Sequence, residues 1–170
     1  MRGLVKRMLL IALGLVGACA PTTAQSTGSA EDVIRQVVSA LAGNDQAGLT
    51  KLTIDQPEFK KYLWPALAMN MSTSNMSADK YYPMYQKANQ AGIAEASTIL
   101  AGKKWQVVNV DLQPAQRKGK GFQVLGPPLV TLRDESGQEK TVKLVGGLLE
   151  RDGVYQVTTF YVNPSLRAAK

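Results

Sequence analysis

The chain has 170 residues and a formal net charge of +7, with one cysteine and no histidine. Without histidine it cannot form Ser-His-Asp or Cys-His catalytic groups, and it lacks the usual ligand of zinc, copper(II) and non-haem iron. With a single cysteine it cannot form a disulfide within the chain.

The first residues have the pattern of a bacterial export signal. Arg2, Lys6 and Arg7 form a basic start, and residues 8–18 follow without a charge. This order is typical of a leader peptide, and its apolar run is shorter than the roughly 20 residues that span a membrane. We therefore expect residues 1–18 to be a signal peptide.

Two cleavage sites compete at the end of this leader. Signal peptidase could cut after a triplet of small residues, at 18–20 or 22–24, although Pro21 disfavours the first. Alternatively, "VGAC" (16–19) resembles the lipobox of bacterial lipoproteins, with Val16 where leucine is usual. That resemblance implies cleavage before Cys19 and acylation of Cys19, and several acyl chains give stable anchoring. Cys19 could also be simply a small apolar residue of the leader.

The lipobox reading predicts where the protein resides. Ala20 rather than aspartate follows Cys19, which in Gram-negative lipoproteins implies transport to the outer membrane, facing the periplasm. Such an address disfavours nucleic acid as a partner. The leader holds three basic residues, so the mature chain would carry 17 basic and 13 acidic residues, a charge of +4. That charge favours anionic surfaces, or it serves only solubility.

The remaining chain divides into a tether and one domain. Residues 19–29 are small and uncharged, which is typical of a flexible linker, and residues 30–170 have the length of a single domain. Its first part predicts helices. Ser29 with Asp32 predicts a helix start, and an apolar stripe at helical spacing follows at Val33, Ile34, Val37, Val38 and Leu41.

Three further helical segments are expected before Gly102. A short helix begins at Asn44 or Asp45 and buries Leu49 and Leu52. Another begins near Pro57. Its buried face is expected to comprise Phe59, Tyr62 and Leu63, and Pro65 is expected to interrupt it. The stretch 66–80 is expected to be irregular or partly helical, and a long helix covers 81–102.

After Gly102 the apolar period changes to two, which predicts strands. Strands are expected over 104–113, 122–134, 139–150 and 154–162. The first would place Val108, Val110 and Leu112 on one face. Residues 114–121 are expected to be a basic glycine-rich loop, and 135–138 a turn. Gly126–Pro128 should break the second strand, Gly146–Gly147 should bend the third, and Asp152–Gly153 should form a hairpin turn.

This order predicts an α+β fold, with N-terminal helices packed on a curved antiparallel sheet of four to five strands. The capped first helix followed by "LAGNDQAGLTKL" (41–52) resembles the opening of nuclear transport factor 2-like domains. That resemblance covers most of 30–163 and implies a bent sheet closed over helices, forming a cone with one open end. The "LWP" segment (63–65) and residues 132–162 also resemble uncharacterised bacterial exported proteins, which supplies no activity.

The catalytic Asp-His pairs common in the resembled superfamily cannot form here. An Asp/Tyr site in an apolar pocket remains open, because burial can raise the pKa of a carboxylate into the working range. The candidates are Asp55, Tyr62, Tyr81, Tyr85 and Asp111. Alternatively, the tyrosines pack in the core and Asp55 caps the helix that begins at Pro57.

Two further groups are candidates for binding. The soft thioethers of Met69, Met71 and Met76, with Met84 beyond, could hold copper(I), or could fill gaps in the core. Arg117, Lys118 and Lys120, with Lys103 and Lys104 on the other side of the strand, could contact an anion, or could be a solvated hairpin tip. No glycine motif has the spacing of a nucleotide site, and no cofactor is expected.

The sequence therefore favours a lipid-anchored, periplasm-facing binding module without a catalytic site. It would hold an envelope protein partner or a small apolar ligand. The alternative is an enzyme that acts on a small molecule through an Asp/Tyr site in the cone.

Overall fold

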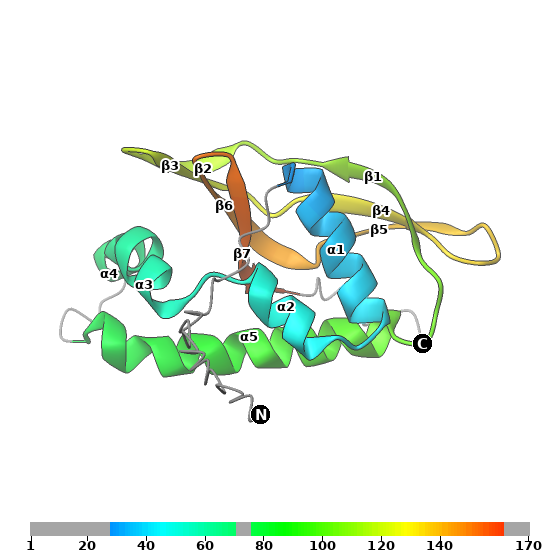
Figure 1. The fold of residues 1–170 in the computed structure, drawn as a ribbon, viewed down its shortest axis with the longest axis horizontal. Helices are drawn as coiled ribbons and strands as arrows, with labels where there is room; N and C mark the ends of the chain where they lie inside the picture. The colour runs from blue at the N-terminus through cyan, green and yellow to red at the C-terminus, as the bar shows by residue number, and fades with distance from the viewer. Residues whose placement is uncertain (1–27, 71–75, 162–170) are drawn as a thin grey trace, which may run out of the picture.

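The computed structural model describes residues 28–70 and 76–161 (Figure 1). Cys19, the leader, most of the tether and Met71 lie outside these residues. The helices are α1 (Ala30–Ala42), α2 (Gln46–Leu52), α3 (Gln56–Glu58), the π-helical turn η1 (Phe59–Leu63), α4 (Trp64–Asn70) and α5 (Ala78–Leu100). The strands are β1 (Gln106–Asp111), β2 (Ala115–Gly119), β3 (Phe122–Leu125), β4 (Leu129–Arg133), β5 (Glu139–Val142), β6 (Val145–Arg151) and β7 (Val154–Phe160). The predicted α+β order, helices first and antiparallel strands second, is confirmed.

The start of α1 follows the predicted capping box. The Ser29 hydroxyl accepts a hydrogen bond from the Asp32 amide at 3.2 Å, and the Asp32 carboxylate accepts one from the Ser29 amide at 2.9 Å. These bonds hold the pKa of Asp32 below its ordinary value. All five residues of the predicted stripe are buried. A local cap and an amphipathic period therefore sufficed to place this helix.

The second and third helical segments agree with the sequence up to Pro65, except that Leu63 is half-buried rather than buried. Asp45 caps α2 through the Gly48 amide at 2.9 Å, and Asp55 caps α3. The expected interruption at Pro65 is wrong, because the chain remains helical to Asn70. The Trp64 amide bonds to the Phe59 carbonyl five residues back, in a π-helical turn. Pro65 therefore lies in the first turn of α4, where a missing amide hydrogen costs little.

Helix α5 is the longest element of the described residues, and it packs against α1, η1 and β7 (Figure 1). It has 23 residues and begins three residues before the predicted start, where the Ser77 side chain accepts from the Lys80 amide. A β-carbon on Gly92 would lie 2.5 Å from the Phe160 carbonyl oxygen. Glycine therefore lets α5 lie directly against the backbone of β7 at this point.

The strands form two antiparallel sheets, ordered β1-β4-β5 and β2-β3-β6-β7. The expected single sheet of four to five strands is therefore wrong. The chain changes sheet between β3 and β4, at the predicted break Gly126–Pro128, because proline has no amide for the strand ladder. It changes again between β5 and β6, before Gly146–Gly147. Those glycines form the predicted bend, since the β6–β7 register shifts on both sides of Gly147.

Two strand-level expectations are corrected. The register of β1 shifts between Val107 and Asn109, so Val107 packs against the core beside Val110, and Val108 is exposed. Leu112 lies beyond β1 and is also exposed. A bulge adds one residue and reverses the faces that simple alternation predicts. Residues 114–121 are mostly strand rather than loop, since β2 pairs with β3 in a hairpin.

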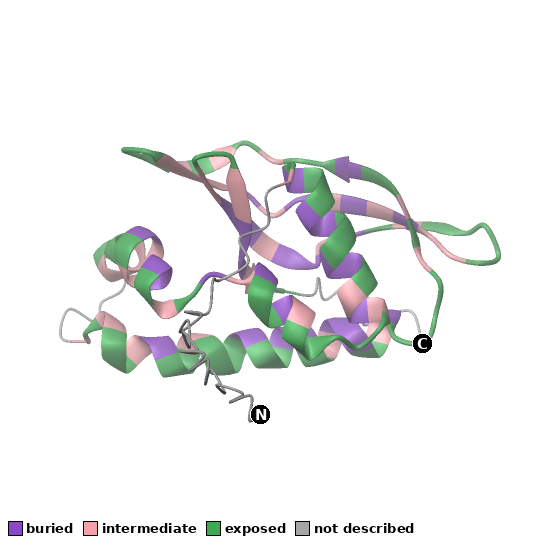
Figure 2. Ribbon diagram, in the orientation of Figure 1, coloured by how far each residue is buried: buried purple, intermediate pink, exposed green. Residues whose placement is uncertain are grey.

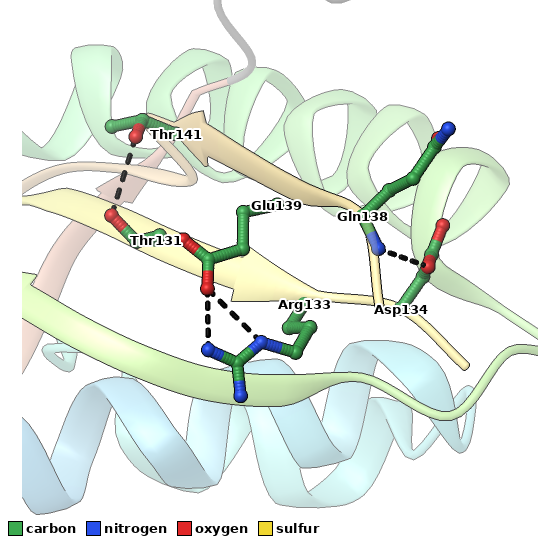
Figure 3. A network of polar contacts seen from close by, with 6 residues as sticks. All are labelled: Thr131, Arg133, Asp134, Gln138, Glu139 and Thr141. Atoms are coloured by element: carbon green, nitrogen blue, oxygen red, sulfur yellow. Dashed lines mark hydrogen bonds and ion pairs between the residues drawn. The ribbon is translucent and has the colours of Figure 1, made fainter. Parts of the chain in front are cut away.

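The turns follow the local sequence. In the β4–β5 hairpin the Asp134 carboxylate accepts from the amides of Ser136 and Gln138, at 2.9 and 3.0 Å, which confirms the turn at 135–138. Figure 3 shows the bond from Gln138. Arg133 donates its Nε–H to Glu139 across the same hairpin at 3.0 Å. Asp152 and Gly153 both have positive φ, 52° and 77°, as the predicted hairpin turn requires.

Figure 2 shows which positions of the ribbon are buried. The buried hydrophobic residues form two clusters. The larger lies between α1, α5 and the sheets. The smaller is aromatic and joins η1 and the start of α5 to β6, around the fully buried Phe59. The Phe59 ring lies 4.6 Å from that of Tyr85 and 5.3 Å from that of Tyr82, centroid to centroid. Among the described helices none has the length and apolarity to cross a membrane.

Candidate functional site

A pocket lies where α2, α3, α5 and β7 meet, with a volume of about 350 Å³. Its apolar lining comes from Ile54, Tyr82, Tyr85 and Ile93. The polar lining residues are Thr50, Lys51, Thr53, Asp55, Glu58, Gln86, Asn89, Gln90 and Gln156. Apolar walls with a few placed polar groups are the usual make-up of a small-molecule site. This pocket is the candidate site.

Glu58 is the buried carboxylate of the pocket. One of its oxygens accepts from the Gln156 side-chain amide at 2.8 Å, and the other lies 3.1 Å from the Arg151 guanidinium. Glu58 also accepts from the Asp55 amide at 3.3 Å, which completes the capping box of α3. Arg151, at the end of β6, therefore balances the negative charge of Glu58, and three partners hold its carboxylate in place.

Two tyrosines and an asparagine of α5 form the opposite wall. The Tyr85 hydroxyl donates to the Thr158 carbonyl of β7, and burial raises the pKa of Tyr85 well above its ordinary value. Burial, with the nearby negative charge of Asp55, also raises the pKa of Tyr82. The Asn89 side chain accepts from the Phe160 amide at 2.9 Å. Tyr82 and Tyr85 therefore stay protonated at neutral pH. Their rings provide apolar surface in the pocket, and their hydroxyls can form hydrogen bonds.

The candidates for an Asp/Tyr site are mostly separated. Asp55 and Tyr85 line the pocket, and Asp55 caps α3 by accepting from the Glu58 amide at 2.8 Å. Tyr62 is not a lining residue. Its hydroxyl accepts from Arg151 at 3.4 Å, and this bond lowers the pKa of Tyr62. Asp111 is exposed on β1 and accepts from the Gln113 side chain at 3.1 Å.

Tyr81 also belongs to the aromatic cluster rather than to the pocket. Its ring stacks on Phe59, 6.1 Å between centroids. The predicted packing role of the tyrosines is thus confirmed for Tyr62 and Tyr81.

The three methionines of this group that the structure describes differ in exposure. Met69 is 78% exposed near the end of α4, and Met84 is 58% exposed on α5. Met76 is half-buried, and Met71 lies outside the described residues. Within 28–70 and 76–161, histidine, cysteine, aspartate and glutamate form no group of three that could hold a metal ion. The copper(I) hypothesis thus stays a prediction without a described site.

The basic residues divide between two ends of the fold. Arg117 donates to the Tyr62 carbonyl at 3.0 Å and lies over the Phe122 ring at 5.8 Å, so it joins β2 to η1. Lys118 and Lys120 are exposed at the β2–β3 hairpin. Lys103 and Lys104 are not part of that hairpin surface. They line a separate hollow beside α1, together with Arg35 and Trp105.

Sequence reasoning missed Glu58, Gln156 and Asn89. Asp55 and Glu58 have the spacing of a capping box, so the sequence could have predicted that Glu58 completes the cap of the helix expected near Pro57. It could not have predicted that the same carboxylate meets Gln156, 98 positions later. Gln156 lies in β7 within three consecutive buried residues, where alternation gives no signal.

Comparisons with family models, with curated proteins and with solved structures find no match to this chain.

Proposed function

We propose that this protein is a lipid-anchored, periplasm-facing binding domain, and that the pocket between α3, α5 and β7 holds a small ligand. The observation that carries the proposal is the pocket's lining, with aromatic and aliphatic walls beside buried amide and carboxylate groups. Its volume of about 350 Å³ lies in the range of small-molecule sites. The lining suits a ligand with both an apolar face and hydrogen-bonding groups.

Binding is favoured over catalysis because the reactive groups are engaged in the fold. Glu58 is held by Arg151 and Gln156, and the Tyr85 hydroxyl donates to a backbone carbonyl. A general base needs a free lone pair aimed at its substrate. Asp55 beside Tyr82 is the remaining pair for the alternative, an enzyme with an Asp/Tyr site. Turnover that is lost in Asp55→Asn, with the ligand still bound, would favour that alternative.

The test of the pocket is native mass spectrometry of the protein isolated from the cells that make it. We expect a small molecule of defined mass on the parent. Gln90→Trp places a bulky ring at the pocket mouth and should abolish this species. Ala91→Trp is the matched control, since Ala91 is exposed on α5 and does not line the pocket. Equal retention by both variants, or a bare parent, would contradict the pocket. A stoichiometric protein instead would make the domain an adaptor.

The anchor and the fold type belong to the same proposal. Cys19 would carry the lipid, and the outer membrane would be its destination. Two sheets packed with α1 and α5 support a cone of the nuclear transport factor 2-like type. The anchor is tested by fractionation: Cys19→Ser should move from the membrane to the soluble periplasmic fraction. If it sediments with membranes as firmly as the parent, the lipid is not what holds the protein there.

A further inference from the structure

A second hollow, of about 520 Å³, lies beside the C-terminal half of α1 and the segment that joins α5 to β1. Arg35, Lys103, Lys104 and Trp105 line it, and Lys140 of β5 lies over the Trp105 ring. We name these five residues the Trp105 patch. The patch shares no lining residue with the candidate pocket. It lies near the C-terminal end of α5, the end away from α4 (Figure 1).

The ammonium groups of Lys140 and Lys103 both lie over the indole ring of Trp105. Its Nε1–H donates to the Leu100 carbonyl at 3.1 Å, which fixes the ring. The ammonium nitrogen of Lys140 lies 4.1 Å from the ring centroid and that of Lys103 lies 5.8 Å away. Burial and the positive charge of Lys103 together lower the pKa of Lys140. The fold therefore keeps like charges close enough to disfavour each other.

Neighbouring negative groups offset only part of this charge. Hydrogen bonds from Ser136 and Gln138 lower the pKa of Asp134, and the nearby positive charge of Lys103 lowers it further. Hydrogen bonds from Ser29 lower the pKa of Asp32, and the positive charge of Arg35 adds to that shift. The C-terminal ends of α1 and α5 also meet here, and neither has a basic residue in its last turn. Each helix end is equivalent to roughly −0.5 of a charge. Four cationic side chains against two carboxylates and about one unit of helix charge leave about one positive charge uncompensated.

We propose that the Trp105 patch docks the domain onto anionic lipid headgroups of the membrane surface. Lysine and arginine attract phosphate groups of acidic lipids, and tryptophan prefers the interface between headgroups and hydrocarbon. The chain between Cys19 and the described residues is also short. Nine residues span at most about 32 Å, and α1 itself is about 20 Å long. A lipid on Cys19 would thus keep the patch within reach of the surface.

The inference uses the proposed function in one respect only: the anchor on Cys19 would keep the domain near the membrane. The test does not need that anchor. The full chain carrying Cys19→Ser would be sedimented with phosphatidylglycerol–phosphatidylcholine vesicles, and with phosphatidylcholine vesicles alone. We expect binding to the anionic vesicles that weakens as salt rises, because salt screens exposed charges. Each basic residue near such a surface is worth about fivefold in affinity.

The decisive comparison uses two charge reversals of equal size. Lys103→Glu with Lys104→Glu replaces two positive charges of the patch by two negative ones, and should weaken binding by more than about thirtyfold. Lys118→Glu with Lys120→Glu makes the same change at the β2–β3 hairpin and should retain most of the affinity. All four lysines are exposed, so both variants are expected to fold, which circular dichroism checks. Equal losses would mean that only net charge matters, and a larger loss from the hairpin would place the surface there. Either result overturns the proposal, as does no binding by the parent.

Trp105 gives a second, local measurement. In a Trp64→Phe background it is the remaining tryptophan, since the chain has two. Its fluorescence should shift to shorter wavelength on anionic vesicles and be quenched by brominated lipid. Unchanged emission with bound protein would contradict docking through this patch. If the patch binds but parent Cys19 proves unmodified by mass, the anchor fails and the docking surface stands. If Cys19 is acylated but the protein does not bind the vesicles, the anchor stands and the docking surface fails.

Discussion

Removal of the Glu58 carboxylate should cost far more stability than removal of an exposed one. In Glu58→Ala three contacts vanish together: the Gln156 amide at 2.8 Å, the Arg151 guanidinium at 3.1 Å, and the Asp55 amide at 3.3 Å. Glu58 and Gln156 are buried, with exposed fractions of 8% and 9%, so water cannot readily replace the lost acceptor.

The magnitude follows from what each partner loses. A buried amide without an acceptor costs about 1–3 kcal/mol, and half of a capping box costs about 0.5–1 kcal/mol. Breaking a buried ion pair from one side costs about 3–5 kcal/mol. The Arg151 side chain is 23% exposed and keeps its bond to Tyr62, so the lower end applies. We expect Glu58→Ala to lower the free energy of unfolding by about 4 to 5 kcal/mol.

Urea denaturation followed by tryptophan fluorescence measures this change, with an unchanged slope as the check that both variants unfold in the same way. Glu139→Ala is the control. Its partner is Arg133 on the surface of the β4–β5 hairpin, where the two side chains are 44% and 41% exposed (Figure 3). An exposed pair is worth about 0–1 kcal/mol. Should Glu58→Ala cost no more than Glu139→Ala, the reasoning from burial would be refuted.

Three other changes test single features of the fold. Gly92→Ala should destabilise the protein by at least about 2 kcal/mol in thermal unfolding, because the new β-carbon would clash with the Phe160 carbonyl. This loss should exceed the gain from the better helix propensity of alanine. A stabilised variant would show that α5 can move away from β7. Ser29→Ala should cost about 1 kcal/mol in urea through loss of the α1 cap, and an unchanged midpoint would mean that another group replaces it. Lys140→Met should stabilise the protein at neutral pH. The folded-state pKa of Lys140 is lowered, so the unfolded chain binds the proton more tightly. The protonated lysine therefore destabilises the folded protein. This destabilisation is complete below the folded-state pKa and disappears as pH rises past the unfolded-state pKa, near 10.4. The extra stability of Lys140→Met should vanish over the same range. A gain that stays constant with pH would be due to packing instead.

The strand half shows where alternation alone misleads. Val108 and Leu112 were expected on one face with Val110, but the bulge before Asn109 exposes Val108, and Leu112 is exposed beyond the end of β1. Nothing in "QVVNVD" marks the bulge, because it arises from how β1 pairs with β4. Likewise, the basic composition of 114–121 indicated a loop, yet β3 provides a partner that makes it a strand. The side chain of Arg117 then reaches η1, more than 50 positions away.

The sequence by itself determined the features that act over a few residues. The caps at Ser29, Asp45 and Asp55, the stripe of α1 and the turn at Asp152–Gly153 each depend on a side chain and the backbone beside it. Only the tertiary structure decided which residues share a pocket, how the strands of the described residues divide into two sheets, and which charges lie near each other. Glu58 meets Arg151, and Lys140 meets Lys103, because packing brings distant segments together. A periodic pattern specifies that a side chain is buried or exposed, but not which side chain lies opposite.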